Sequence, residues 1–143
     1  VDSIGKKINA VQSMIDEIGL GERVRAEKLR AEEIPNDYKQ RFNFVTFRAV
    51  AKTNILLEYA EPFLASHGTL IVMKANVDGI ELQDASQAAK IFGYENVSRE
   101  TFELPNDLGH REILLYRKVG KSKIKLPRKT GMAKSNPFVA RRD

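Results

Sequence analysis

Residues 42–75 read FNFVTFRAVAKTNILLEYAEPFLASHGTLIVMKA. The stretch opens with aromatic and β-branched residues that favour a strand over 42–50. It closes with GTLIVMKA (68–75), a nearly all-apolar run after a glycine, as expected for a strand buried on both faces of a parallel sheet. Between the two, TNILLEYAEPFL (53–64) predicts a helix that Pro62 ends or kinks. The stretch therefore predicts a strand–helix–strand unit.

The residues before this unit predict a helix and a weak strand. Isoleucine and valine recur at spacings of four and three along 4–18, which is one stripe of an amphipathic helix. Gly19 or Gly21 suits the end of that helix. RVRAEKLRAEEI (23–34) follows and favours a short strand with a polar loop. Val1 to Ser3 resembles the end of a buried strand that runs into the first helix.

The residues after the unit predict one more helix and two final strands. The helix covers 80–92, with Gly93 as its stop, and the strands cover 97–104 and 111–119, joined by the turn PNDLGH. Alternating strands and helices indicate an α/β fold with a doubly wound, Rossmann-like sheet. Two consecutive strands at the end allow an antiparallel edge pair, which is the usual ending of Rossmann-like methyltransferases and not of dehydrogenases.

Composition narrows the class of protein. A chain of 143 residues that is 42% hydrophobic is the size of one domain with its own core. No apolar run approaches the ~20 residues that span a bilayer, so we expect no membrane partner and a cytoplasmic location. The sequence has no Cys, which excludes disulfides and a thiol nucleophile, and its two His are far apart, so we expect no metal site.

The charge is strongly asymmetric. Residues 1–116 carry 14 Lys and Arg against 18 Asp and Glu, whereas residues 117–143 carry 10 against Asp143 alone. We therefore divide the chain into a partial α/β domain (1–119) and a basic C-terminal arm (120–143). A cationic arm favours a polyanionic partner such as nucleic acid. The alternative is a solvated tail that aids solubility.

Six segments together resemble one known family. They are VDSIGKK, LRAEEI, FNFVTFRAVA, LIVMKA, HREILLYRKV and KLPRKTGMAKSNPF, in order and over nearly the whole chain. The chain resembles the RsmG/GidB family, bacterial methyltransferases that form 7-methylguanosine in 16S ribosomal RNA with S-adenosylmethionine. The basic tail is the most family-specific segment. The resemblance implies a Rossmann-like S-adenosylmethionine-dependent methyltransferase fold and a 16S rRNA or small-subunit partner.

The chain also departs from the family. An N-terminal helical region, a first strand and a glycine-rich cofactor loop are absent from this sequence, and Gly19-Leu20-Gly21 follows a helix, which is the wrong context for such a loop. A sheet without its central first strand leaves two unpaired inner edges. We therefore expect the fold to be incomplete at its N-terminus and the chain to be neither stable nor active as a monomer. A longer N-terminus or another chain would fill the gap.

Four residues are candidates for binding the adenosine part of the cofactor. An acid at the tip of the second strand accepts hydrogen bonds from ribose hydroxyls in doubly wound folds, and the resemblance gives that role to Asp2, with Ser3 beside it. The alternative is a cap for the helix that follows. The resemblance places Ala31 and Glu32 beside the adenine ring, and the alternative for these two is a solvated acidic turn.

Two cations end the strands of the central unit. Arg48 comes directly after the aromatic run of the 42–50 strand, at the carboxyl end of the sheet. From there it could bind the cofactor carboxylate or an RNA phosphate. A surface ion pair is the alternative. Lys74 ends the apolar strand at the same edge, and we expect it to contact RNA or cofactor. The alternative for Lys74 is a snorkelling side chain.

The remaining candidates form a phosphate-binding surface. They are Arg111, Lys123, Lys125, Arg128, Lys129 and Lys134. Arg111 is carried over from the family motif but His110 is not, because the turn reads Leu-Gly-His-Arg-Glu here. Pro127 and Gly131 would shape the arm without touching RNA. Taken singly, each cation is also compatible with simple solvation.

No catalytic acid or base is expected. Guanine N7 has a free lone pair and no proton to remove, so methyl transfer needs mainly proximity and alignment. We therefore predict a 16S rRNA (guanine-N7) methyltransferase when the protein is complete. A non-catalytic RNA-binding fragment that uses the basic arm is the first alternative. A small-molecule enzyme on a similar sheet is the second, and it would leave the arm without a purpose.

Overall fold

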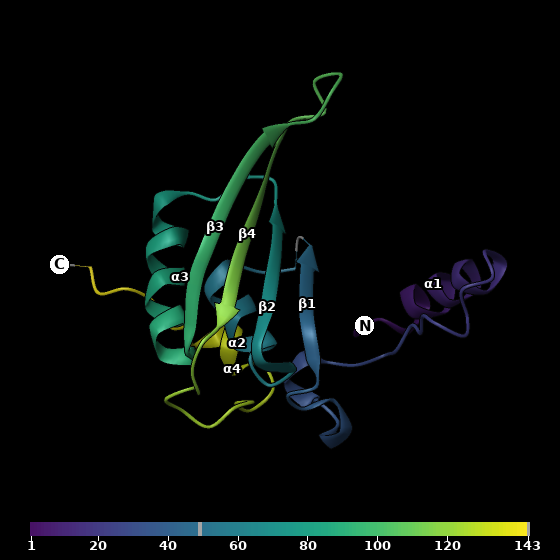
Figure 1. The fold of residues 1–143 in the computed structure, drawn as a ribbon, viewed down its shortest axis with the longest axis horizontal. Helices are drawn as coiled ribbons and strands as arrows, with labels where there is room; N and C mark the ends of the chain where they lie inside the picture. The colour runs from purple at the N-terminus through teal and green to yellow at the C-terminus, as the bar shows by residue number, and fades with distance from the viewer. Residues whose placement is uncertain (49, 143) are drawn as a thin grey trace.

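A four-stranded mixed sheet organises the computed structural model, which describes residues 1–48 and 50–142 (Figure 1). The strands are β1 (Phe42–Arg48), β2 (Leu64–Lys74), β3 (Tyr94–Glu103) and β4 (His110–Lys118), in the order β1-β2-β4-β3. β1 and β2 are parallel, and β4 runs antiparallel to both β2 and β3. The mixed sheet and the C-terminal antiparallel pair confirm the predicted fold class.

The strand–helix–strand unit forms as predicted, with shifted bounds. Helix α2 (Thr53–Ala60) is buried along its whole length and ends two residues before Pro62. Strand β2 begins at Leu64, four residues earlier than expected, because Leu64 pairs with Phe42 across a bulge before the regular register starts at Phe44 and Thr69. The carboxyl ends of β1 and β2 therefore meet at one edge of the sheet.

The core lies between the sheet and the two helices that cover one face of it. Helix α3 (Gly79–Phe92) begins at Asp78, whose Oδ1 accepts a hydrogen bond from Glu81 N at 2.7 Å, and ends at Gly93. Gly93 has φ of 78°, and a Cβ there would lie 2.6 Å from Gly120, so only glycine fits. Fully buried side chains fill the interior, among them Leu56, Leu57, Leu70, Val72, Phe92 and Leu114.

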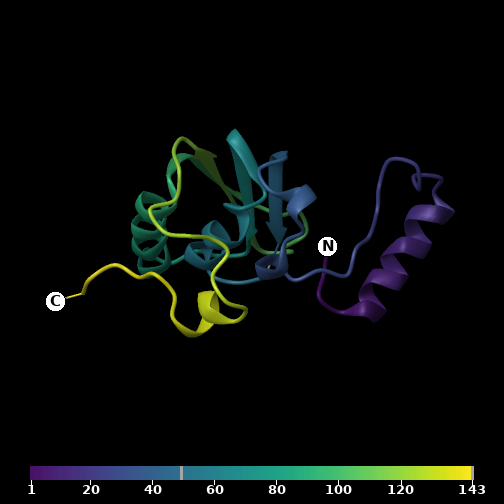
Figure 2. The same cartoon turned by 90° about the horizontal axis from the view of Figure 1, so that it is seen from below.

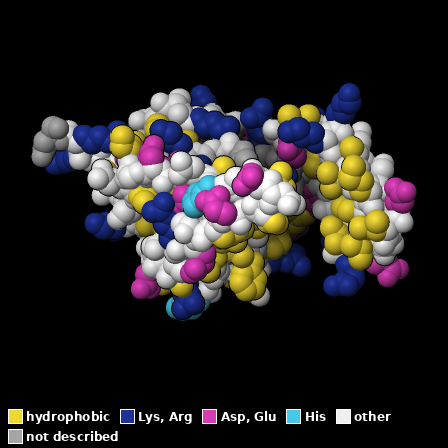
Figure 3. All heavy atoms as spheres, turned by 90° about the horizontal axis from the view of Figure 1, so that it is seen from above, with side chains coloured by type: hydrophobic (Ala, Val, Ile, Leu, Met, Phe, Trp, Pro, Cys, Tyr) yellow, Lys and Arg dark blue, Asp and Glu magenta, His cyan; other side chains and the backbone are white. Residues whose placement is uncertain are grey.

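The N-terminal helix lies apart from the sheet. Helix α1 (Gly5–Glu17) matches the predicted helix, but of its apolar stripe only Ile15 is buried. Ile18 is 67% exposed, and apolar side chains gather on α1 beside the space that separates it from β1 (Figures 1 and 3). The stripe stays exposed because α1 does not pack on the sheet.

The strand predicted within 23–34 is wrong. Only an isolated parallel bridge forms there, between Asp2 and Lys28, with Asp2 N donating to Glu27 O at 3.2 Å and Leu29 N donating to Asp2 O at 3.0 Å. These two hydrogen bonds do not continue as a β-ladder. After them the chain forms two short 3-10 helices, η1 (Ala31–Glu33) and η2 (Asn36–Tyr38).

The C-terminal arm packs on the α2 and α3 side of the molecule and carries the short helix α4 (Met132–Ser135) (Figure 2). Phe138 contacts Phe92 edge to face at 5.4 Å between ring centroids, and its carbonyl accepts a hydrogen bond from Asn54 Nδ2 at 2.8 Å. Ala133 is fully buried. The arm is thus an added layer over the helices.

Across the described residues, no helix combines the length and apolarity that a bilayer crossing requires.

Candidate functional site

Four predicted residues meet at one pocket beside β1. Asp2, Ser3, Ala31 and Glu32 come from two segments and line a cavity of about 220 Å³, which we call the β1 pocket. Its other lining residues are Val1, Leu29, Arg30, Phe47, Val50, Tyr59, Gly131 and Lys134. The pocket lies between the N-terminal segment and the side of the sheet that begins with β1.

Asp2 is fixed by its backbone and keeps one carboxylate oxygen available. The bridge to Lys28 holds its main chain, and Oδ1 accepts a hydrogen bond from Ile4 N at 2.9 Å. Oδ2 is 3.9 Å from the ammonium of Lys7, and the side chain is 39% exposed. The first carboxylate oxygen therefore closes a short turn before α1, while the second makes no hydrogen bond within the described residues and is open to a hydroxyl donor. The helix cap that was the alternative for Asp2 does not form, because Ile4 is the N-cap residue of α1 and no side chain caps the helix.

The acidic turn η1 is tied to the C-terminal arm. Glu32 Oε1 accepts a hydrogen bond from Gly131 N at 3.2 Å, and Glu33 Oε1 accepts one from Thr130 Oγ1 at 3.2 Å. Both carboxylates thus have partners on the arm. These contacts hold the backbone of Ala31 and Glu32 at the pocket wall.

An apolar wall completes the β1 pocket. Phe47 and Val50 come from β1 and the loop after it, and Tyr59 comes from α2. Burial raises the pKa of the Tyr59 hydroxyl to about 12, with the charge of Glu32 adding to the effect, so the hydroxyl stays protonated. The sequence reasoning did not select these three residues. Phe47 and Val50 could have been found from the sequence, because they lie close to Arg48, the residue predicted to lie at the carboxyl end of this strand.

Arg48 and Lys74 lie at the carboxyl edge but in different surroundings. Arg48 is the last residue of β1 and is exposed. Lys74 Nζ donates to Ala51 O at 2.8 Å and lies 2.9 Å from Glu81 Oε1. Glu81 also accepts hydrogen bonds from Thr53 N at 2.8 Å and Thr53 Oγ1 at 2.6 Å. Lys74 therefore joins the end of β2 to the first turns of α2 and α3.

A second cavity adjoins the β1 pocket along this edge. It measures about 390 Å³ and is lined by Val50, Ala51, Lys52, Lys74, Ala75 and Asn76. We call it the tip cavity. Val50 lines both hollows, so the two are neighbours at the carboxyl ends of the parallel strands, where ligands bind in doubly wound folds.

Arg111 lies away from both cavities, on the hairpin that β3 and β4 form. Its Nη1 donates to His110 O at 2.6 Å, and its register partner is Phe102. The neighbouring Glu112 is buried and accepts hydrogen bonds from Arg99 Nε at 2.7 Å and Val77 N at 2.9 Å. Chiefly the hydrogen bond from Arg99 lowers the pKa of Glu112. This network ties the turn end of the hairpin to Val77, just before α3.

The predicted cations of the arm divide into three kinds. Lys123, Lys125 and Lys129 are exposed, on a segment whose Ile124 and Leu126 pack against the core. Arg128 instead binds Glu58, with Nε to Oε1 at 2.7 Å and Nη2 to Oε2 at 2.6 Å.

The third kind is Lys134, which lines the β1 pocket. The sequence reasoning missed Glu58 as the partner of Arg128. Its signal was an acid in the otherwise apolar helix TNILLEYA.

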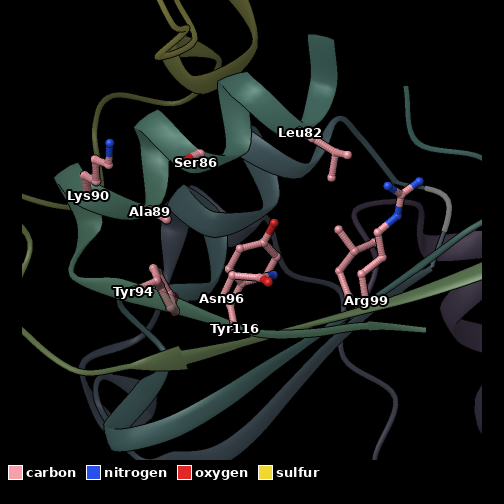
Figure 4. A pocket seen from close by; sticks show the side chains of 9 residues that line it. Leu82, Ser86, Ala89, Lys90, Tyr94, Asn96, Arg99 and Tyr116 are labelled. Atoms are coloured by element: carbon pink, nitrogen blue, oxygen red, sulfur yellow. The ribbon is translucent and has the colours of Figure 1, made fainter. Parts of the chain in front are cut away.

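A larger cavity lies elsewhere, between α3 and the β3–β4 hairpin, and measures about 480 Å³ (Figure 4). Tyr116 and Asn96 lie near its middle, with Lys90 and Arg99 at opposite ends. None of the residues predicted from the sequence lines it. Arg99 is already bound to Glu112, so this cavity adds no free cation of its own at that end.

A mixed sheet with an antiparallel C-terminal pair and a cavity at the carboxyl ends of its parallel strands define the S-adenosylmethionine-dependent methyltransferase fold. The antibiotic-resistance methyltransferase Kmr superposes with a TM-score of 0.61 at 14% identity, over 85% of this chain and 75% of that one. The 1,6-didemethyltoxoflavin-N1-methyltransferase of Burkholderia thailandensis, solved with S-adenosylhomocysteine, superposes with a TM-score of 0.56 at 16% identity, over 76% and 56%. These likenesses show the fold.

The family model GidB, rRNA small subunit methyltransferase G, matches residues 1–112, and the chain belongs to this family. The ribosomal RNA small subunit methyltransferase G of Lactococcus lactis subsp. lactis (strain IL1403) is 38% identical over 140 residues. The match covers 96% of this chain and 58% of that protein, so the chain spans a little over half of the relative's length. The family predicted from the sequence is confirmed.

Proposed function

We propose that this chain carries the adenosine-binding and RNA-facing parts of a cytoplasmic methyltransferase that forms 7-methylguanosine in 16S ribosomal RNA. One observation carries the proposal: Asp2 with Ser3 and Ala31 with Glu32, from two separate segments, line a single pocket beside the carboxyl end of β1. The names of the chain's relatives, such as the one in Lactococcus lactis, supply the rRNA substrate.

The residues of the β1 pocket fit the adenosine half of S-adenosylmethionine. The free oxygen of Asp2 can accept from a ribose hydroxyl, because a carboxylate takes several donors. Phe47, Val50 and Tyr59 offer the apolar wall that a flat purine requires. About 220 Å³ is below the usual range of roughly 300–1,000 Å³ for whole ligands, which agrees with a pocket for half of the cofactor.

The tip cavity would receive the rest of the cofactor and the target base. S-adenosylmethionine, when bound, supplies an activated methyl group. Guanine N7 carries no proton, so this chain's residues need only position the two reactants and exclude water. Arg48, exposed at the end of β1, is the residue we assign to the cofactor carboxylate. Lys74 is held in place by Glu81 and by the carbonyl of Ala51. We therefore propose that it forms part of the cavity wall and gives that wall a positive charge.

Binding of S-adenosylhomocysteine, measured by isothermal titration calorimetry, tests this proposal. Asp2→Asn keeps an acceptor for Ile4 N but removes the charge, and hydrogen bonds to a charged group contribute about 1.5–3 kcal/mol. We therefore expect affinity to fall roughly 10- to 100-fold while the helix content of α1, followed by circular dichroism, is unchanged. Glu17→Gln, at the exposed far end of α1, is the matched control and should bind as the wild type does.

The RNA-binding alternative makes a different prediction. It expects salt-sensitive binding of RNA with no binding of S-adenosylhomocysteine by the wild-type chain, and that pair of results would reject the cofactor pocket. Transfer of a labelled methyl group to 16S rRNA, with the modified nucleoside identified by mass spectrometry, tests the position of methylation. Label in any nucleoside other than 7-methylguanosine would contradict the assignment.

A further inference from the structure

Lys134 is the one cation of the C-terminal arm that reaches the β1 pocket among the described residues. It lies on α4, about a hundred residues along the chain from Ala31 and Glu32, yet it lines the same cavity as they do. Sequence reasoning places it with the RNA-binding lysines, because the whole arm is basic. The structure separates it from Lys123, Lys125 and Lys129, which line neither the β1 pocket nor the tip cavity.

The arm holds α4 at the pocket through contacts on both sides. Before α4, Arg128 is anchored to Glu58 by two short hydrogen bonds. At its start, Gly131 N donates to Glu32 Oε1 at 3.2 Å. Within α4, Ala133 is fully buried. The neighbouring position, 134, is therefore held on the rim of the pocket although its own side chain is exposed.

The charges around the pocket leave a place for Lys134. Asp2 and Glu32 are the acids of the lining, and each accepts a hydrogen bond from elsewhere, Asp2 from Ile4 N and Glu32 from Gly131 N, while Arg30 is a second cation of the lining besides Lys134. Within the described part of the chain, no ion pair or side-chain hydrogen bond involves the Lys134 ammonium. A donor without a partner beside an apolar cavity is suited to a ligand that brings acceptors or an aromatic face.

We propose that Lys134 is a further cofactor-binding residue, whose ammonium contacts the adenosine half of S-adenosylmethionine in the pocket that Asp2 also lines. Adenine offers ring-nitrogen acceptors and a π face, and both attract a cation. This inference rests on the proposed function, because it assigns a contact within the same pocket. It also gives the arm a second task besides meeting RNA, which is to form the outer wall of the nucleoside site.

Calorimetric titrations with S-adenosylhomocysteine and with adenosine test the inference on the 143-residue chain, supplied with the longer N-terminus or the second chain that the sequence predicts it needs in order to be stable. We expect Lys134→Met to weaken both ligands by about 5- to 30-fold, the range for one partly desolvated cation–π contact. Lys134→Arg keeps the cation and should recover most of the affinity. Lys129→Met removes an exposed lysine of the same arm outside the pocket, and it should bind both ligands within twofold of the wild type.

Each other outcome overturns a defined part of the argument. If the wild type binds S-adenosylhomocysteine and Lys134→Met binds it equally well, Lys134 is not a cofactor contact, although the cofactor pocket stands. If only S-adenosylhomocysteine is weakened and adenosine is not, Lys134 acts on the other half of the ligand and the adenosine contact is wrong. If the wild type binds neither ligand, the cofactor pocket and the role of Lys134 both fail.

Discussion

Arg128 and Glu58 form a buried bidentate ion pair between the C-terminal arm and the middle of α2. Their atoms meet at 2.7 Å (Nε to Oε1) and 2.6 Å (Nη2 to Oε2), and the side chains are only 15% and 4% exposed. The guanidinium also lies 4.6 Å from the ring centroid of Phe138. A basic residue of the arm therefore stabilises the fold, in addition to any contact that the arm makes with a polyanionic partner.

The same pattern recurs at two further places. Buried acids of the α2 and α3 region bind cations from the last part of the chain in the pairs Glu61 with Lys118 and Asp84 with Arg142. Lys118 Nζ also donates to two carbonyls, those of Glu61 and Leu64. Three acids of the mildly acidic domain thus hold three of the ten cations of residues 117–143.

Removing Arg128 should destabilise the chain strongly. Arg128→Met leaves the Glu58 carboxylate buried without its partner, which typically costs about 3–5 kcal/mol. We expect a loss of about 3 kcal/mol in the free energy of unfolding, measured by urea denaturation. Replacing both partners, as Arg128→Met with Glu58→Met, should recover much of the loss because no buried charge is left unpaired.

Lys129→Met is the control for this series, since Lys129 is exposed one residue away. Its effect should stay within about 0.5 kcal/mol. Equal stability of the Arg128 and Lys129 variants would show that the ion pair does not hold the arm.

The stability of the chain should depend on acid through Glu112. Its pKa is lowered from the usual 4.5, first by the hydrogen bond from Arg99 and also by the one from Val77 N. A carboxyl whose folded-state pKa is depressed adds stability above its unfolded-state pKa and loses that contribution as the pH falls through the folded-state value. Wild-type stability should therefore fall below about pH 4.5.

Glu112→Gln removes this contribution. We expect the variant to be less stable at pH 7 and its unfolding free energy to change less than that of the wild type between pH 5 and pH 3, measured by urea denaturation at each pH. Glu100→Gln, on the exposed strand β3, should run parallel to the wild type. A parallel curve for Glu112→Gln would mean that Glu112 does not contribute to the acid dependence.

Local patterns were sufficient for most helices and strands of the fold. The apolar run of β2, the spacing of α1 and the Gly93 stop of α3 are encoded in neighbouring residues, and the structure has each of them. The strand predicted within 23–34 failed because its β-branched content is low and its one bridge, to Asp2, does not extend. What sequence could not give was the exposure of the α1 stripe, because that depends on what packs beside it.

The candidate site was predictable only in part, for a related reason. Asp2, Ser3, Ala31 and Glu32 followed from strand tips and family motifs, and the structure brings the four together. The role that we propose for Lys134 could not follow, because the arm meets the acidic turn through residues far apart in the chain, such as Thr130 and Glu33, which are 97 positions apart. Charge along a sequence does not separate a cation that binds a buried acid from one that stays free.

Three exposed lysines of the arm should carry the salt dependence of RNA binding. Lys123, Lys125 and Lys129 are exposed, while Ile124 and Leu126, which lie between them in the sequence, pack on the core. Each phosphate neutralised on single-stranded nucleic acid contributes roughly 0.7 to the slope of log affinity against log salt. Replacing all three by Ala should make the slope for a single-stranded 16S rRNA fragment shallower by about 2, measured by fluorescence anisotropy.

The double variant Lys6→Ala with Arg23→Ala is the control. It removes exposed cations from the N-terminal segment, in and after α1, and should leave the slope nearly unchanged. An unaltered slope in the triple variant would place the RNA elsewhere on the molecule.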